Sequence, residues 1–184
     1  MKNRKYSIFC LLIIMVFGIT SPVSAASKDL SSYPIAKQEK KNWCWAAVSS
    51  SVLKFMTGEN VYQCDFVKYV KSSTCNDVSA TTEEAQSGMH HFGVSSNYYS
   101  GSLSMSQIKA QIDDGRPIYV SWKWNSPNAL IGHAVAIYGY SDDSVKYLDP
   151  WEGVKTSLSY TNFKGGSDYD RTWRWGLRDF WDYK

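Results

Sequence analysis

The feature that most constrains the fold is a helix that starts at a cysteine and is apolar along one side. Residues after Cys44 recur at helical spacing and are apolar: Ala47, Val48, Val52, Phe55 and Met56. Asn42 is a favourable N-cap, and Gly58 is placed to end the helix. Because such a helix is buried along one side, the sequence predicts that Cys44 is held rigidly at a helix N-terminus.

That position suits a nucleophile. The thiolate is the reactive form of cysteine, and a helix N-terminus stabilises it through unpaired N–H groups and the helix dipole. Gln38 lies six residues upstream, and its side-chain amide can join the backbone N–H of Cys44 as a donor to an oxyanion. Cys44 is therefore the candidate nucleophile, and Gln38 is a candidate oxyanion-hole residue.

An activated thiol needs a base, and the chain has only three histidines. His90 and His91 lie near the end of a predicted helix, where a packing or surface role is expected. His133 begins a predicted strand after Gly132, a residue that lets another group approach closely. His133 is therefore the candidate base.

Asp149 is the candidate partner of that base. It follows a predicted strand over 144–148, and a turn at Asp142 and Asp143 separates this strand from the one over 134–140. Two strands joined by such a turn pair antiparallel, which would bring Asp149 near His133. A carboxylate there accepts the second imidazole N–H and fixes the tautomer. The alternative for Asp149 is a turn residue, since Asp before Pro often marks a turn.

The first 25 residues have the pattern of a signal peptide. Lys or Arg occupies positions 2, 4 and 5, an apolar run covers 8–18, and Val-Ser-Ala at 23–25 gives small residues at the cleavage positions. The run is shorter than the roughly 20 residues that span a bilayer. We expect 1–25 to be removed and 26–184 to form one secreted domain, with no membrane contact after signal removal.

Charge then gives no sign of nucleic acid. Three of the 20 Lys and Arg lie in the leader, and those that remain are as numerous as the 17 Asp and Glu. A nucleic-acid-binding domain would need a basic face. The aromatic tail from Trp173 to Tyr183 is predicted to pack rather than to bind sugar. We expect a monomer.

The cysteines outside the leader are odd in number, which implies one unpaired thiol in an oxidising compartment. Cys64 and Cys75 are close in sequence and can close a short loop, worth about 3 kcal/mol. That pairing leaves Cys44 free, although spacing alone does not prove connectivity. The Cys and His spacings match no paired zinc-ligand pattern, so neither a metal nor a cofactor is expected.

Predicted helices precede predicted strands, which indicates an α+β domain of two lobes. Beyond the helix at Cys44, helices are expected over 64–71, from Thr81 to about His91, and from Ser104 or Ser106 to Ile112, with Thr81 and Glu84 as a capping box. Strands are expected over 118–122, 134–140 and 144–148, and a last one between Arg171 and Gly176.

Three blocks together resemble the papain-like cysteine peptidases: Gln38 with Asn-Trp-Cys-Trp-Ala-Ala at 42–47, Gly-His-Ala-Val at 132–135, and Asp-Pro-Trp at 149–151. They are most similar to the compact bacterial branch that includes staphopains and plant-pathogen effector proteases. The resemblance implies a papain-like fold, with Cys44 on the central helix of an N-terminal helical lobe. It places His133 and Asp149 on a C-terminal, barrel-like antiparallel lobe. It implies that Cys44 attacks, His133 shuttles protons, Asp149 orients His133 and Gln38 supports the oxyanion.

The expected activity is therefore that of a secreted endopeptidase acting on proteins or peptides. The chain lacks a long pro-region, so a separate inhibitor or activating partner is one expected restraint. Candidate walls of the substrate cleft are Trp43, Trp45, Trp122, Trp124 and Trp151. The alternatives are a Cys-His cell-wall peptide hydrolase or amidase, an acyltransferase of the same fold, and a non-catalytic exported interaction domain.

Overall fold

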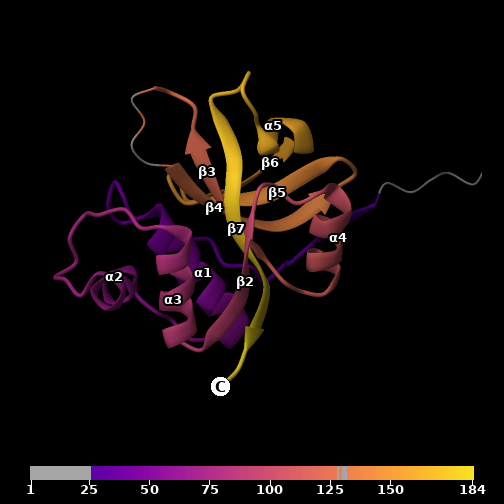
Figure 1. Ribbon diagram of the computed structural model, residues 1–184. Helices are drawn as coiled ribbons and strands as arrows, with labels where there is room; N and C mark the ends of the chain where they lie inside the picture. Colours follow the sequence, from indigo (N-terminus) through magenta and orange to yellow (C-terminus); the bar gives the residue numbers. More distant parts are fainter. Residues whose placement is uncertain (1–25, 128, 130–131) are drawn as a thin grey trace, which may run out of the picture.

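The computed structural model describes residues 26–184 except 128 and 130–131, so the predicted signal peptide over 1–25 lies outside the described residues. Two lobes are visible in Figure 1, one helical and one built on a sheet. The helical lobe contains α1 (Cys44–Thr57), α2 (Gln63–Lys71) and α3 (Thr82–His91). Within the described ranges, no helix is both long and apolar enough to cross a membrane.

The second lobe is an antiparallel sheet in the order β2-β7-β3-β4-β5-β6, with β1 pairing to the end of β4. Its strands are β1 (Ser27–Asp29), β2 (Val94–Ser100), β3 (Ile118–Trp124), β4 (Gly132–Ser141), β5 (Ser144–Asp149), β6 (Val154–Ser159) and β7 (Arg171–Asp182). Two more helices, α4 (Met105–Asp113) and α5 (Tyr160–Lys164), lie against this lobe. The fold is α+β, with a helical N-terminal lobe and an antiparallel sheet, as predicted.

The helix α1 runs almost where the sequence places it. The helix stops before Gly58, its C-cap, which adopts a left-handed conformation with φ of 78° and donates its N–H to the carbonyl of Lys54. The prediction that Asn42 caps the helix is wrong, because Trp43 occupies the N-cap position and no side chain caps the helix. The side-chain amide of Asn42 instead donates to the carbonyl of Asp77, 3.3 Å away.

Two other helix starts follow their sequence signals. Thr81 and Glu84 form a reciprocal capping box at the start of α3. Ser104 and Gln107 do the same for α4, so Ser104 and not Ser106 is the N-cap that opens this helix. Both boxes satisfy backbone N–H groups that the first helical turn would otherwise leave unpaired.

Strands β2 and β6 were not expected from the sequence. Most positions of β6 are exposed, and the second half of β2 is largely exposed as well, so neither has a marked apolar pattern. Strand β7 is also longer than the predicted strand over 171–176 because it pairs with both β2 and β3. In its aromatic tail Trp173 and Phe180 are buried, whereas Trp181 and Tyr183 are exposed.

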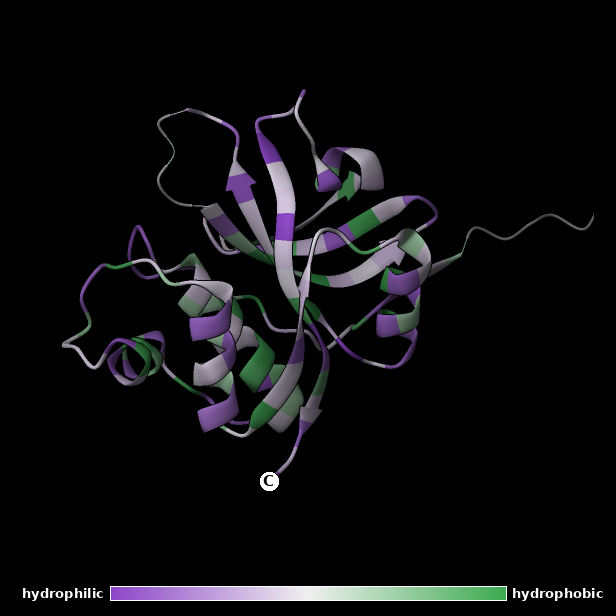
Figure 2. Ribbon diagram, viewed as in Figure 1, coloured by the Kyte–Doolittle hydropathy of each residue, from purple (hydrophilic) through white to green (hydrophobic). Residues whose placement is uncertain are grey.

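The core joins the two lobes where α1 packs against β4. Val48 and Val52 of α1 are fully buried, as are Val135 and Ile137 of β4. Figure 2 shows hydrophobic residues gathered on α1 and on the strands, with hydrophilic residues on the outer turns of α3 and α4. Because α1 is buried against the sheet, its first residue is held at the boundary between the lobes.

Candidate active site

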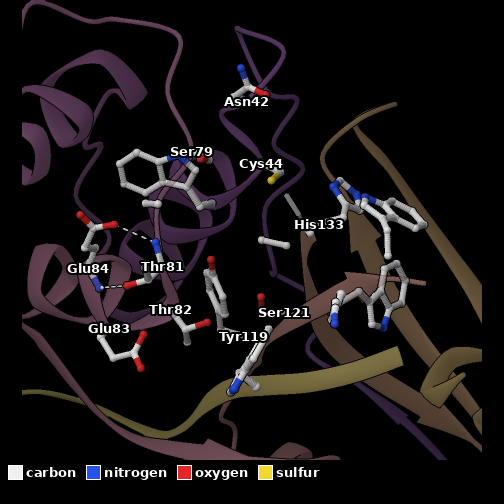
Figure 3. Close-up of a pocket in the computed structure, with 18 of the residues that line it drawn as sticks. Asn42, Cys44, Ser79, Thr81, Thr82, Glu83, Glu84, Tyr119, Ser121 and His133 are labelled. Carbon is white, nitrogen blue, oxygen red and sulfur yellow. Dashed lines mark hydrogen bonds between the residues drawn. The ribbon is translucent and has the colours of Figure 1, made fainter. Parts of the chain in front are cut away.

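Cys44 is the first residue of α1 and the free cysteine among the described residues. Its backbone N–H belongs to the first helical turn, whose donors have no partner inside the helix. The side chain is partly exposed and borders a cleft between the lobes. Figure 3 shows Cys44 beside His133 at the edge of this cleft. The helix therefore presents the thiol, with free N–H donors beside it, to the open cleft.

Residues 75–78, called here the 75–78 segment, anchor the chain on both sides of Cys44. The indole N–H of Trp43 donates to the carbonyl of Asn76 at 2.9 Å, and that of Trp45 donates to the carbonyl of Val78 at 3.0 Å. The backbone N–H of Asn42 donates to the carboxylate of the same segment at 2.8 Å. The two tryptophans therefore act as anchors that fix where the helix begins.

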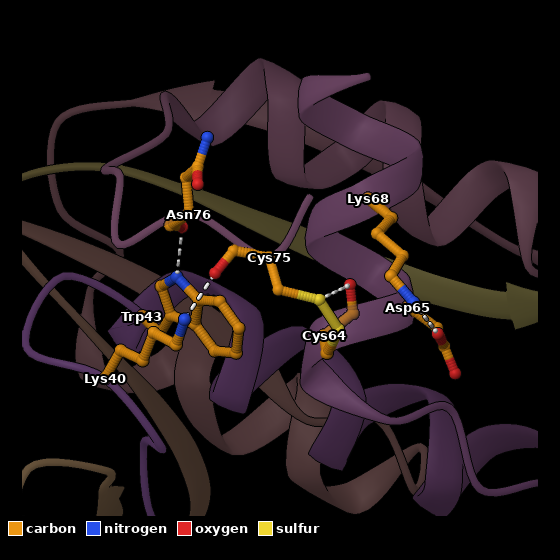
Figure 4. The surroundings of a disulfide bond; sticks show 7 residues. All are labelled: Lys40, Trp43, Cys64, Asp65, Lys68, Cys75 and Asn76. Atoms are coloured by element: carbon orange, nitrogen blue, oxygen red, sulfur yellow. Dashed lines mark hydrogen bonds and ion pairs between the residues drawn. A yellow bond between two sulfur atoms is a disulfide. The ribbon is translucent and has the colours of Figure 1, made fainter. Parts of the chain in front are cut away.

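A disulfide between Cys64 and Cys75 ties the 75–78 segment to α2, with Cα atoms 5.1 Å apart. Figure 4 shows this bond beside Trp43 and Lys40, whose ammonium group donates to the carbonyl of Cys75. The predicted pairing is therefore present. It links α2 to the start of α1 through a single short loop.

His133 lies near the start of β4 and is buried between two indole rings. Its ring centroid is 6.1 Å from that of Trp122 and 6.1 Å from that of Trp124, which is stacked on it. Gly132 makes this packing possible, because a Cβ at that position would lie 1.9 Å from the carbonyl oxygen of Trp122. The ring is thus fixed by a close approach of β3 to β4.

Asp149 ends β5, the strand next to β4. Its Oδ1 lies 2.8 Å from Nε2 of His133 and also accepts the backbone N–H of Trp151 at 3.0 Å. Since Nε2 is engaged by the carboxylate, Nδ1 is the ring nitrogen left to exchange a proton with Cys44. The hairpin thus brings the imidazole and the carboxylate together, as the predicted strands imply.

The electrostatics favour a charged imidazole. Burial lowers the pKa of His133, but the hydrogen bond with Asp149 and the nearby Cys44 side chain outweigh it and raise this pKa from 6.5 to about 9. Burial raises the pKa of Asp149, yet its bond to His133 brings the net pKa below the usual 3.8. At neutral pH the pair is therefore imidazolium and carboxylate.

The cleft has a volume of about 730 Å³ and runs between α3 and β3, with Cys44 and His133 on its walls. Trp45, Trp122, Trp124 and Trp151 line it. Trp43 does not, because it is only 1% exposed and packs against the 75–78 segment. A second cavity of about 420 Å³ is lined by His133 and Asp149, and its three tryptophans also line the cleft.

Gln38 stands close to this region but is turned away from it. Its backbone N–H donates to the carbonyl of Pro150 at 2.8 Å, which holds it beside the end of β5. Its side-chain amide donates to the carbonyls of Lys40 and Lys41, at 2.9 and 2.7 Å. Both amide hydrogens are thereby used, so a role for Gln38 at an oxyanion requires one of these bonds to be exchanged for substrate.

Sequence reasoning missed a group of hydroxyls that line the cleft, those of Thr82, Tyr119 and Ser121. Tyr119 and Ser121 alternate along β3 and so share one face of the strand. That alternation was visible in the sequence. Which face would meet the cleft was not, because the lobe opposite β3 is contributed by distant residues.

Comparison with known proteins bears on the family and the fold of the chain. Residues 27–168 match the family described as papain-like cysteine protease AvrRpt2. No curated protein matches the chain.

Solved structures share the fold. The peptidase domain of Streptococcus ComA, a bifunctional ABC transporter involved in quorum sensing, superposes with a TM-score of 0.60 at 18% identity, covering 79% of this chain and 96% of that one. A C39-like peptidase from Bacillus anthracis gives 0.62 at 12% identity, with 83% and 97% covered. The cysteine protease CMS1MS2 of Carica candamarcensis, solved with E-64, gives 0.58 at 14% identity, with 83% and 96% covered.

These likenesses show the fold, and the family match covers most of the described residues. The chain therefore belongs to the AvrRpt2 family of papain-like cysteine proteases and is a cysteine peptidase.

Proposed function

We propose that the protein is a secreted endopeptidase that cleaves peptide bonds through a thioester on Cys44. His133 acts as the proton shuttle, and Asp149 orients it. The backbone N–H of Cys44 and the side-chain amide of Gln38 serve as oxyanion donors. The observation that carries the proposal is the 2.8 Å contact between His133 and Asp149, in a cleft that Cys44 also borders.

The chemistry proceeds in two steps. The Cys44 thiolate attacks the carbonyl carbon, and the carbon–nitrogen bond breaks while Nδ1 of His133 gives its proton to the leaving amine. Water then attacks the thioester carbonyl and loses a proton to His133, and the carbon–sulfur bond breaks, which releases the acid and regenerates the thiolate and the imidazolium. The elevated pKa of His133 suits the first step, because the imidazolium can persist beside a thiolate at neutral pH.

The test uses thiol chemistry with a matched control. Wild type, Cys44→Ala and His133→Ala are incubated with a peptide library and, separately, with iodoacetamide. We expect turnover in wild type alone, alkylation confined to Cys44, and slow alkylation in His133→Ala because its thiolate has lost the imidazolium. Undiminished turnover by Cys44→Ala would overturn the proposal.

The oxyanion role is tested separately with Gln38→Ala. Losing one oxyanion donor typically lowers kcat by about 10²–10³-fold. Gln38→Glu is a second variant, which keeps the size of the side chain but places a carboxylate where the oxyanion forms. Both variants should lower kcat with little change in the free energy of unfolding, and wild-type kcat in Gln38→Ala would remove this residue from the mechanism.

Secretion is supported by the leader pattern at 1–25 and by the Cys64–Cys75 disulfide, a bond that persists in oxidising compartments. Sequencing the N-terminus of protein recovered from the culture medium tests it. A first residue at or near Ala26 is the expected result, and retention of Met1 in the recovered protein would contradict it.

A further inference from the structure

The floor of the cleft beside Cys44 is built from hydroxyls. Tyr119 is only 2% exposed and Thr82 is 5% exposed, yet both line the cleft together with Ser121. In Figure 3 the hydroxyl of Tyr119 points up into the hollow below Cys44, and the hydroxyls of Thr82 and Ser121 lie around it. A buried side chain that carries its one polar atom into a cleft is placed to meet a ligand.

These hydroxyls make no hydrogen bond to the other cleft residues that Figure 3 draws. Among the residues drawn in Figure 3, hydrogen bonds join only Thr81 and Glu84, and none reaches Thr82, Tyr119 or Ser121. Each hydroxyl can donate one hydrogen bond and accept two. Water satisfies them while the cleft is open, but a substrate side chain that displaces this water must replace its bonds or leave them unmade.

The hollow lies on the acyl side of the scissile bond. His133 must face the leaving amine to protonate it, so the leaving group lies toward His133. In Figure 3 Tyr119 and Thr82 lie below and to the left of Cys44, whereas His133 lies to its right. A side chain that enters the hollow therefore belongs to a residue that precedes the cleaved bond.

The charges around the hollow do not select a charged side chain. Lys71 is neutralised by Glu84 at 2.7 Å. Glu83 is exposed beside Tyr98, and charges of the opposite sign, those of Lys41 and Lys123, also line the cleft. Burial, followed by the nearby Cys44, raises the pKa of Tyr119 well above 10, so this hydroxyl stays neutral. A carboxylate in the hollow would also be repelled by the thiolate.

We propose that Tyr119, assisted by Thr82 and Ser121, is the specificity-determining residue of the acyl side and selects an uncharged side chain that forms hydrogen bonds: Ser, Thr, Asn or Gln. The inference rests on the proposed function and names the substrate class of the same site. An apolar isostere entering the hollow would leave buried hydroxyls unpaired, which typically costs about 1–3 kcal/mol, or roughly 5- to 150-fold in kcat/KM.

The experiment pairs isosteric substrates with isosteric variants. Each of the four residues before the scissile bond is varied in a peptide library, and kcat/KM is then measured for Thr against Val and for Asn against Leu at the position that responds. Wild type should prefer Thr and Asn by about 10-fold or more, and Tyr119→Phe should remove most of that preference. Tyr138→Phe, a buried tyrosine of β4 outside the cleft, is the matched control and should keep it.

Ser121→Ala provides a second variant should Tyr119→Phe fold poorly, and a smaller loss of preference is expected from it. A wild-type preference for Lys, Arg or apolar residues, or an unchanged Thr/Val ratio in Tyr119→Phe, would overturn the inference while leaving the peptidase intact. Absence of any peptide turnover by wild type would instead overturn the proposed function, and the inference with it.

Discussion

Replacing Cys64 and Cys75 together by alanine should weaken both the fold and the reactivity of Cys44. The two cysteines are 11 residues apart, and the bond between them closes the loop that ends at the 75–78 segment. On the chain-entropy model, opening a loop of this length costs about 3 kcal/mol of unfolding free energy. Since small domains are stable by only about 5–15 kcal/mol, this is a large fraction of the total.

The effect on reactivity follows from what the loop holds. Without the disulfide the 75–78 segment keeps its hydrogen bonds to Trp43 and Trp45 but loses its tie to α2. The start of α1 is then less firmly positioned, and a displacement of about 1 Å at a reacting group can cost up to 10²-fold in rate. We therefore expect kcat to fall more than KM changes.

Chemical denaturation measures the first effect, and alkylation of the one remaining thiol, Cys44, measures the second. Tyr33→Phe is a suitable control, because it removes a buried hydrogen bond to Ser51 within α1, away from Cys44. It should cost about 1 kcal/mol and leave kcat unchanged. An unchanged unfolding free energy in the double variant would refute the entropy argument. If Cys44 of the double variant is alkylated at the wild-type rate and kcat is unchanged, the anchoring role of the 75–78 segment is refuted.

Four further predictions have defined outcomes. Asp149→Asn should lower the pKa of His133 from about 9, because burial then acts without the opposing carboxylate. The alkaline limb of the kcat/KM profile should therefore move to lower pH. An unmoved limb would contradict the assignment of Asp149 as the partner of His133. The raised pKa of His133 should also increase the free energy of unfolding. This contribution should be fully present below pH 6.5 and be lost as pH rises through about 9, and measuring the unfolding free energy against pH checks it. Gly132→Ala should lower kcat/KM because its Cβ would meet the carbonyl of Trp122, so full activity would show that β4 can shift freely. Thr81→Ala should cost about 1 kcal/mol in denaturant through loss of its cap on α3, and no change would contradict the capping geometry.

Features that depend on neighbours in sequence were predictable. The apolar spacing in α1 and the glycine at its end are local signals, and the helix follows them closely. The proximity of His133 and Asp149 was predictable in part: the short turn pairs β4 with β5, but the register also shifts between Ile137 and Gly139, and the turn residues do not indicate that shift. Their roles in catalysis remain a prediction.

Features that depend on distant segments were not predictable. Trp43 and Trp45 flank Cys44 symmetrically in the sequence. Trp43 nevertheless packs only against the 75–78 segment, whereas Trp45 also lines the cleft. The orientation of the Gln38 amide depends on the backbone carbonyls of Lys40 and Lys41, which accept its hydrogen bonds. Residue types alone do not predict where these carbonyls point. Strand β6 carries no apolar pattern because it is an edge strand with most side chains in solvent.

The sulfur of Cys44 belongs to a helix of one lobe, whereas His133 and Asp149 belong to a single hairpin of the other. The imidazole and the carboxylate are therefore fixed to each other by one hairpin, whereas the sulfur is positioned relative to them through the packing of α1 against β4. A change that loosens this packing would separate the nucleophile from its base and leave the bond between His133 and Asp149 in place.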